Sequence, residues 1–400
     1  MEISSLIRII DWIIFAIVCG TVFYMFYFAL GALFYKNNRY SKASRKARFL
    51  ILIPAYAEDK VIMSTVMSTL DQQYPTKEYD VVVISDHMNE MTNTYLAQFP
   101  ITLILPKFEE GTATKARALN YAMRHMPNLK HYDMVVVLDA DNVIEDSFLD
   151  SINDAYQSGI KIIQTHRISK NRNTPSALLD ACFEEINNSI FRKGHVQFGF
   201  SSALVGSGIA FEYDWFKENV GKVFTSGEDK EFEALLLKQN IYIEYLDNVV
   251  VYDEKTQKSD HFNNQRRRWL AAQYSALFHN IAHLPKAIFT HQRDYADKII
   301  QWMLIPRTLL MAIIAIMCVI WPFFSGFVAA KWYILGAFVM FIFAMSLPDY
   351  LVDDKFEKFF YKGAPSVMLG ALRNIFRLKG QSRKFEHTEH YIDENLNINK

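Results

Sequence analysis

The stretch that decides the fold is DMVVVLDADN, residues 133–142. The apolar run from Met134 to Leu138, with three consecutive valines, is typical of a strand that is buried on both faces of a sheet. Asp139 and Asp141 follow directly, so both carboxylates can reach one divalent cation, which prefers oxygen ligands. Asp and Asn also favour solvated turns, so a plain turn is the alternative. The motif therefore predicts a buried strand that ends either in a metal site or in a polar turn.

Further short apolar runs predict more strands of the same sheet. They are FLILIP (49–54), DVVVIS (80–85) and IKIIQT (160–165). Helical patterns such as Thr114–Met126 lie between them. This alternation predicts an α/β domain over residues 49–275 with a mostly parallel sheet, and ligands at the carboxyl ends of its strands.

Acidic side chains follow three of these strands. Tyr56 and Glu58 come after the first, Asp86 after the second, and the Asp139/Asp141 pair after the third. Acids in these places indicate a metal or a hydroxyl-rich ligand. No phosphate-binding G-x-x-x-x-G-K-[ST] loop is present, and no G-x-G-x-x-G follows the first strand, which argues against a dinucleotide oxidoreductase.

The segment TSGEDKEFEALLLKQN (225–240) has the pattern of a helix start. Ser226 can cap the helix, and acidic residues fill its first turn. Glu228 and Asp229 could simply complement the helix dipole. A carboxylate that follows Gly227 at a helix start is also well placed to accept a proton from a substrate hydroxyl.

The segment FNNQRRRWLAAQY (262–274) carries three consecutive arginines, Arg266 to Arg268, beside Trp269. They could anchor the chain at a membrane surface. They could equally hold a phosphorylated ligand, with the tryptophan face beside a flat group.

Apolar segments flank the predicted domain. Residues 12–35 contain no charged side chain and are long enough to span a bilayer, and six basic residues follow from Lys36 to Arg48. A signal peptide is disfavoured, because the apolar run is too long and no small-residue cleavage site follows it. The positive-inside rule then places the α/β domain in the cytoplasm. Further apolar stretches run over 308–330 and 332–347, with a break near Pro322, Ser325 and Gly326.

The predicted organisation is therefore membrane-bound, with about three transmembrane helices, one N-terminal and two C-terminal, and interfacial helices. Its segments are an N-terminal transmembrane helix (1–35), a basic linker (36–48), the α/β domain (49–275), an interfacial segment (276–301), a transmembrane hairpin (302–348) and a cytoplasmic amphipathic segment and tail (349–400). The net charge of zero gives no support for a nucleic-acid partner, and the three scattered cysteines define no disulfide framework or zinc site.

Taken in order, these motifs resemble the membrane-bound family 2 glycosyltransferases, especially cellulose, hyaluronan and chitin synthases. The matching elements are IPAYAE (53–58), Asp86, TKARALNYAM (114–123), DAD (139–141), VGSG (205–208), GED (227–229) and QRRRW (265–269). The resemblance implies a GT-A fold and an inverting transfer of sugar from a nucleotide diphosphate. The second strand ends in Ser85-Asp86 instead of the paired aspartates usual in the family.

The resemblance also implies roles for single residues. Tyr56, Glu58 and Asp86 would line the nucleotide pocket, with Lys115 nearby. Asp139 and Asp141 would hold the donor and its Mg²⁺ or Mn²⁺. Asp229 would be the general base, with Glu228 beside it in the substrate site. The motif written Q-x-x-R-W would consist of Gln265, Arg268 and Trp269. Residues 385–390, FEHTEH, match a pocket-closing loop of cellulose synthases only at Phe385 and Thr388.

The expected function is transfer from a UDP-sugar to a growing polysaccharide at the bacterial inner membrane. The alternative is addition of a single sugar to a lipid-linked acceptor, because relatives of both kinds carry Q-x-x-R-W. A non-enzymatic nucleotide-sugar sensor or a scaffold subunit is the rival from another class, but it predicts loss of Asp139, Asp141 or Asp229, and all are present. Three spans are few for a polymer channel, so a homo-oligomer or a secretion partner could supply further helices.

Overall fold

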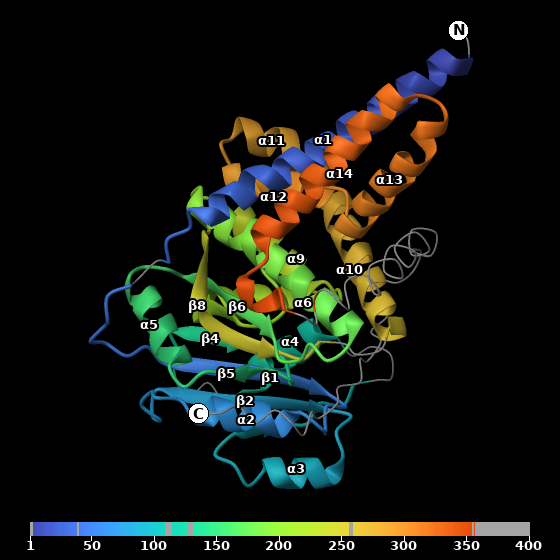
Figure 1. Ribbon diagram of the computed structural model, residues 1–400. Coiled ribbons are helices and arrows are strands. Elements are labelled where there is room, and N and C mark those ends of the chain that lie inside the picture. Colours follow the sequence, from blue (N-terminus) through green and yellow to red (C-terminus); the bar gives the residue numbers. More distant parts are fainter. Residues whose placement is uncertain are drawn as a thin grey trace.

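The computed structural model describes residues 3–37, 40–108, 114–126, 131–255, 259–353 and Phe356. An α/β domain fills the lower half of the molecule in Figure 1, and long helices project from one end of it. Both the N-terminal end of α1 and the turn between α13 and α14 point away from the domain.

An eight-stranded sheet forms the centre of the domain, in the order β3-β2-β1-β4-β7-β6-β8-β5. The strands are β1 (Phe49–Tyr56), β2 (Tyr79–Asp86), β3 (Thr102–Ile104), β4 (Met134–Val137), β5 (Val143–Ile144), β6 (Ile162–Ser169), β7 (Ile209–Glu212) and β8 (Ile243–Asp253). Four of the seven pairings between these strands are parallel. The sheet is thus mixed, with a parallel half around β1, and the predicted GT-A type of α/β class is confirmed.

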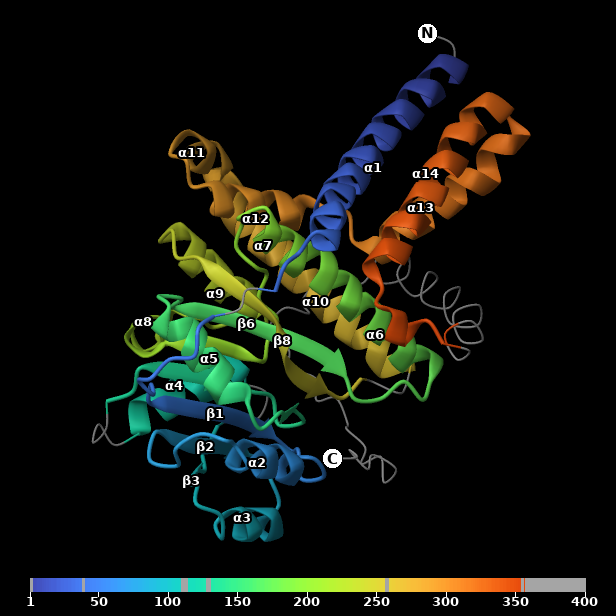
Figure 2. The same ribbon diagram turned by 60° about the vertical axis from the view of Figure 1, so that its left-hand side comes forward.

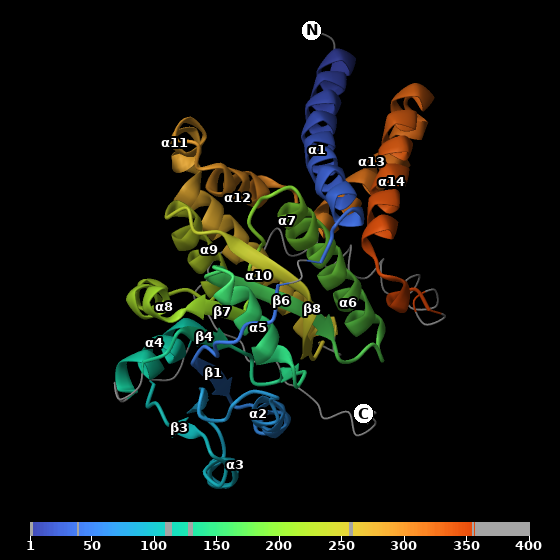
Figure 3. The same ribbon diagram turned by 90° about the vertical axis from the view of Figure 1, so that its left-hand side faces the viewer.

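Helices cover both faces of the sheet (Figure 3). On one face, Ile51 and Val83 pack with α2 (Ile62–Leu70) and α5 (Phe148–Gln157). On the other face, the alternate residues of the same strands pack with α4 (Lys115–His125) and α9 (Glu228–Lys238). Side chains of successive strand residues point to opposite faces, so a strand needs an unbroken apolar run when both faces are covered. This explains why the central strands are almost wholly apolar.

The remaining helices complete the domain and include the candidate membrane spans. They are α3 (Glu90–Leu96), α6 (Pro175–Asn187), the π-helix η1 (Asn188–Gly194), α7 (His195–Gln197), α8 (Tyr213–Asn219), α10 (Ser259–Asn280), α11 (Leu284–Phe289), α12 (Arg293–Met303), α13 (Arg307–Ile320) and α14 (Gly326–Ser346), besides α1 (Ile3–Leu33) and short 3-10 turns.

Two described helices are each long and apolar enough to cross a membrane, α1 over Leu6–Leu33 and α14 over Gly326–Ser346. A third span results only if α12 and the segment Arg307–Phe323 count together, because they are bent by 47° at a short break. The apolar stretch 308–330 is not one helix. It breaks at Trp321–Phe323, where Pro322 lacks a backbone N–H, and Ser325 then caps α14 by accepting from the Val328 N–H.

Helix α1 is fastened both to α14 and to the domain. Asp11 of α1 contacts Lys331 and accepts from Trp332 Nε1 at 2.9 Å. Toward the domain, α1 approaches η1 so closely that a Cβ on Gly194 would lie 2.0 Å from the Phe28 carbonyl oxygen. Such a contact is possible only for glycine. The position of α1 is therefore tied to the segment that follows α6.

The end of the domain nearest to α1, α13 and α14 also carries α11 and α12 (Figures 1 and 2). Phe278, Ile288 and Phe289 are exposed on this side, with Phe289 83% accessible. Aromatic and aliphatic side chains exposed beside candidate spans are typical of segments that lie in a membrane interface. This is the region for which the sequence predicts an interfacial segment.

Candidate active site

A cavity of about 510 Å³ opens at the carboxyl ends of β1, β2 and β4 and continues to α1 and α13. The structure brings every residue of the predicted site to this one cavity. They are Tyr56, Glu58, Asp86, Lys115, Asp139, Asp141, Glu228, Asp229, Gln265, Arg268 and Trp269. Their segments are up to about two hundred residues apart in the chain, so the grouping arises from the fold.

The ends of β1 and β2 meet in register, with Tyr56 opposite Asp86. Ala57 and His87 directly after these residues have positive φ angles of 52° and 55°, so both strands end in sharp turns. Asp86 is buried, and its Oδ1 lies 2.6 Å from His87 Nδ1. The ring centroids of Tyr56 and His87 are 5.0 Å apart. These side chains form a polar, aromatic wall that suits a flat heterocyclic base.

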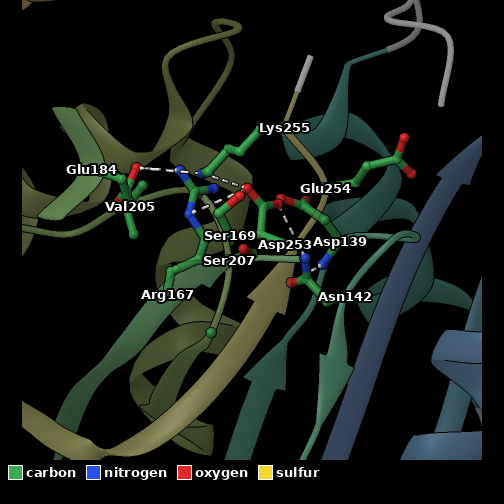
Figure 4. A network of polar contacts seen from close by, with 12 residues as sticks. Asp139, Asn142, Arg167, Ser169, Glu184, Val205, Ser207, Asp253, Glu254 and Lys255 are labelled. Carbon is green, nitrogen blue, oxygen red and sulfur yellow. Dashed lines mark hydrogen bonds and ion pairs between the residues drawn. The ribbon is translucent and has the colours of Figure 1, made fainter. Parts of the chain in front are cut away.

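Three carboxylates converge next to this wall. One carboxylate oxygen from each of Asp139, Asp141 and Asp253 lies within 4.8 Å of the others. Asn142 supports the cluster by donating to Asp141 at 3.1 Å. It also donates to Asp253 at 3.4 Å (Figure 4). Asp253 at the end of β8 was not predicted, although the run VVVYD (249–253) repeats the pattern of a strand that ends in an acid.

Cations border the three carboxylates. Lys115 contacts Asp139 and donates to the Gly206 carbonyl at 2.6 Å. Burial raises the pKa of Asp253, but Arg167 and Lys255 outweigh it and lower the pKa to about 2. The carboxylate therefore stays ionised at neutral pH. Three oxygen donors this close, at least one of them held ionised, fit Mg²⁺ or Mn²⁺.

The predicted base lies at the first turn of α9. The helix begins at Glu228 with Gly227 at the N-cap position, not Ser226, and no side-chain cap bond forms. A Cβ on Gly227 would lie 2.7 Å from the Ala272 Cβ of α10, so a side chain here would push the two helices apart. Gly227 thus lets α9 carry Glu228 and Asp229 close to the helix that carries Arg268 and Trp269.

The two acids of α9 have different surroundings. Asp229 Oδ2 pairs with Lys230 Nζ at 3.1 Å, and its side chain is 22% exposed to the cavity. Lys230 in turn lies 3.8 Å from Glu233. For Glu228, burial and then the neighbouring Asp229 charge raise the pKa to about 7 against the lowering effect of Lys115. Glu228 can therefore carry a proton near neutral pH.

Helix α10 contributes the predicted Q-x-x-R-W residues. Trp269 is 42% exposed, so its indole face is available to a ligand. Arg268 and Gln265 line the cavity, as does Arg266. Arg266 stacks on the Phe183 ring at 4.2 Å and faces Asp180 at 4.0 Å. The sequence pattern did not distinguish Arg266 as a cavity residue. Phe385–His390, the suggested closing loop, lies outside the described residues.

The family follows from residues 47–272, which match the model described as glycosyltransferase like family 2. The chain belongs to this family. Mannosyltransferase PcManGT from Pyrobaculum calidifontis, in complex with GDP-Man and Mn²⁺, is similar at 16% identity with a TM-score of 0.53, over 92% of this chain and 98% of that chain. It shares the fold. The chain is therefore a glycosyltransferase of the GT-A class.

Other similar proteins match a smaller share of the chain or superpose on it with a lower TM-score. S. aureus TarS 1-349 in complex with UDP-GlcNAc is 13% identical with a TM-score of 0.45, over 83% of this chain and 89% of that chain. The probable glycosyltransferase YdaM from Bacillus subtilis (strain 168) is 27% identical over 100 residues, which are 24% of this chain and 23% of YdaM. The match thus spans less than a quarter of that relative's length.

Proposed function

We propose that this glycosyltransferase is an integral membrane protein that transfers a sugar from a UDP-sugar to a growing polysaccharide with inversion at the anomeric carbon. The observation that carries the proposal is the single cavity in which the Asp139, Asp141 and Asp253 cluster faces Asp229 and Arg268. An acidic cluster at strand ends suits a nucleotide diphosphate with its cation, and a carboxylate opposite suits proton removal from an acceptor.

Separate groups of residues bind the donor and the acceptor. Tyr56, Glu58 and Asp86 hold the nucleoside, and Lys115 positions Asp139 by direct contact. Asp139, Asp141 and Asp253 would hold Mg²⁺ or Mn²⁺, which would supply positive charge to neutralise the diphosphate. That PcManGT was solved with GDP-Man and Mn²⁺ supports this class of donor and cation.

The transfer step uses residues of α9 and α10. An acceptor hydroxyl oxygen attacks the anomeric carbon as the bond from that carbon to the diphosphate oxygen breaks, and the bonding electron pair leaves with UDP. Asp229 takes the hydroxyl proton, and Lys230 holds that carboxylate at 3.1 Å. Arg268 stabilises the growing negative charge on the diphosphate, and Trp269 supports the apolar face of the acceptor sugar. Glu228 lies beside Asp229 at the substrate.

The second candidate is addition of one sugar to a lipid-linked acceptor. Met25 of α1 and Leu309 of α13 both line the cavity, so it reaches the candidate spans. A lipid acceptor could enter there from the membrane without a polymer channel. In both cases the domain faces the cytoplasm of a bacterial inner membrane, because the basic linker that follows α1 favours that side.

The test is a donor panel with product sizing. Membranes that contain the full chain are incubated with Mn²⁺ and labelled UDP-sugars, with GDP-mannose as a further donor. Label that enters a long product supports polysaccharide synthesis, and label in a single lipid-soluble product supports the second candidate. No incorporation from any donor, together with no binding of UDP, would reject a transferase and favour a scaffold role.

A further inference from the structure

Two arginines meet at the membrane end of the cavity. Arg266 of α10 and Arg307, the first residue of α13, both lie over the ring of Phe183, at 4.2 Å and 5.1 Å from its centroid. Both arginines line the same cavity as Asp229 and the acidic cluster. Neither belongs to the set that the donor diphosphate requires. A pair of like charges around one aromatic ring repels unless an anion lies between or beside them.

The carboxylate charge near Arg307 is shared with several other cations. Glu184 is engaged by other cations, namely Arg167 at 2.9 Å, Arg192 at 3.1 Å and Lys255 at 3.9 Å. Figure 4 shows Arg167 and Lys255 turned toward Glu184 and Asp253. Asp180 is the carboxylate that faces the pair, 4.0 Å from Arg266. Among the described residues, no carboxylate lies within salt-bridge distance of Arg307, because Glu184 pairs with other cations and Asp180 faces Arg266.

The guanidinium group of Arg307 is also poorly satisfied. Arg307 donates from Nη2 to the Phe183 carbonyl at 3.2 Å, but its Nη1 is buried without a hydrogen-bond partner among the described residues. Arg307 also begins α13, where the helix dipole disfavours a cation. Burial lowers the pKa of Arg266 to about 10 against the raising effect of Asp180. A buried guanidinium with an unused donor is costly, and an oxyanion would remove that cost.

The surroundings indicate what carries such an anion. Met25 of α1, Ile305 before α13 and Leu309 on α13 line the cavity beside Arg307. An anionic group here would therefore continue into an apolar chain directed toward the candidate spans. Guanidinium groups bind phosphate and carboxylate oxygens in a planar, two-pronged manner, which favours an anion over a neutral headgroup. The tetrahedral oxygens of a phosphate can meet two guanidinium groups from different directions, whereas the two oxygens of a carboxylate lie in one plane.

We propose that Arg266 and Arg307 form an acceptor subsite that binds the phosphate of a lipid phosphate, and this inference rests on the proposed function. It selects the lipid-linked acceptor class, whether one sugar or many are then added. The phosphate serves as an anchor, because Asp229 is suited to deprotonating a hydroxyl and a phosphate oxygen needs no base. The reacting hydroxyl thus belongs to a sugar carried on that lipid phosphate.

The experiment measures binding of dodecyl phosphate to the purified full chain in dodecyl maltoside, a detergent without phosphate, by calorimetry. Dodecanol and inorganic phosphate are titrated separately, and UDP with Mn²⁺ reports on the donor site. We expect dodecyl phosphate to bind at least ~10-fold more tightly than either fragment. Arg266→Gln and Arg307→Gln should each weaken it by about 10-fold or more, the usual effect of losing a charged hydrogen bond, and leave UDP affinity unchanged.

Matched variants keep the result decisive. Arg293→Gln removes an arginine that stacks on Phe200 outside the cavity, so it should bind dodecyl phosphate like the wild type. Arg307→Lys keeps the charge but not the planar fork, and should give an intermediate loss even if Arg307→Gln does not fold.

The inference is overturned if variants that bind UDP normally also bind dodecyl phosphate as tightly as the wild type, or if inorganic phosphate binds as tightly as dodecyl phosphate. Failure of the wild type to bind any nucleotide would instead reject the proposed function. The two failures are therefore distinguishable in the same titrations.

Discussion

Substituting Gly227 by alanine should damage catalysis by moving the predicted base, because the new methyl group would meet α10. The added Cβ would lie 2.7 Å from the Cβ of Ala272, and the next nearest atom is an ordinary 3.7 Å away. Carbon atoms in contact normally lie roughly 3.5–4.0 Å apart. Helices α9 and α10 must therefore separate by about 1 Å at this point.

Both the stability and the rate should respond. Overpacking of this kind costs about 1–3 kcal/mol of folding free energy. The same shift moves Asp229 relative to Arg268, and a displacement of about 1 Å in a reacting group can lower turnover by about 100-fold. We expect Gly227→Ala to reduce turnover to that extent with little change in UDP affinity, because the Asp139, Asp141 and Asp253 cluster is on other segments.

The assay is sugar transfer at saturating donor, with thermal unfolding in detergent. The variant Ala272→Gly in the Gly227→Ala background removes the clashing methyl group and should restore turnover, at a cost of about 1 kcal/mol for glycine inside a helix. Gly221→Ala is the matched control, because its Cβ would meet the side chain of Asn120 at an ordinary 3.5 Å. Normal turnover in Gly227→Ala, or no rescue by Ala272→Gly, would refute the reasoning.

Three further outcomes are expected. Asp253→Asn should raise the Mn²⁺ concentration needed for activity by at least ~10-fold, and EDTA should abolish transfer; full activity in excess EDTA would contradict the metal site. Glu228 has its pKa raised from the ordinary 4.5 to about 7 in the folded state. The folded protein therefore binds that proton more tightly, so wild-type stability should fall relative to Glu228→Gln as pH rises from about 4.5 to about 7; parallel melting curves over that range would show that Glu228 titrates normally. In intact cells, a cysteine at exposed Phe324 should label from outside and one at exposed Ser158 should not, and the reverse pattern would invert the topology.

The grouping of the candidate site was predictable because parallel strands end at one edge of a sheet. Asp86 and Asp139 each follow an unbroken apolar run, and such runs occur where both faces of a strand are covered. The contribution of Asp253 to the site could be predicted only with knowledge of the strand order. Residues of β8 and β4 are more than one hundred positions apart, and the pairing of β8 with β5 and β6 brings Asp253 to the acidic cluster.

Other features depend on contacts between segments that no local pattern reveals. Gly227 reads as a helix-start residue, and the sequence does not show that Ala272 lies against it. Arg266 and Arg268 belong to one run of arginines, and no local pattern shows that Arg266 stacks on Phe183. The length of α14 was underestimated because Lys331 interrupts the apolar pattern, whereas its charge is compensated by Asp11 of α1.

The central claim is tested most directly by comparing the turnover of Asp229→Asn with that of Glu228→Gln at saturating donor. The UDP affinity of both variants is measured in parallel. Asp229→Asn keeps the shape of the side chain and removes its basicity. We expect UDP affinity near that of the wild type and a rate about 10²- to 10⁴-fold lower, the usual contribution of a positioned general base, with the milder loss in Glu228→Gln. Near-normal turnover in Asp229→Asn, with Glu228→Gln inactive, would contradict the assignment of the base.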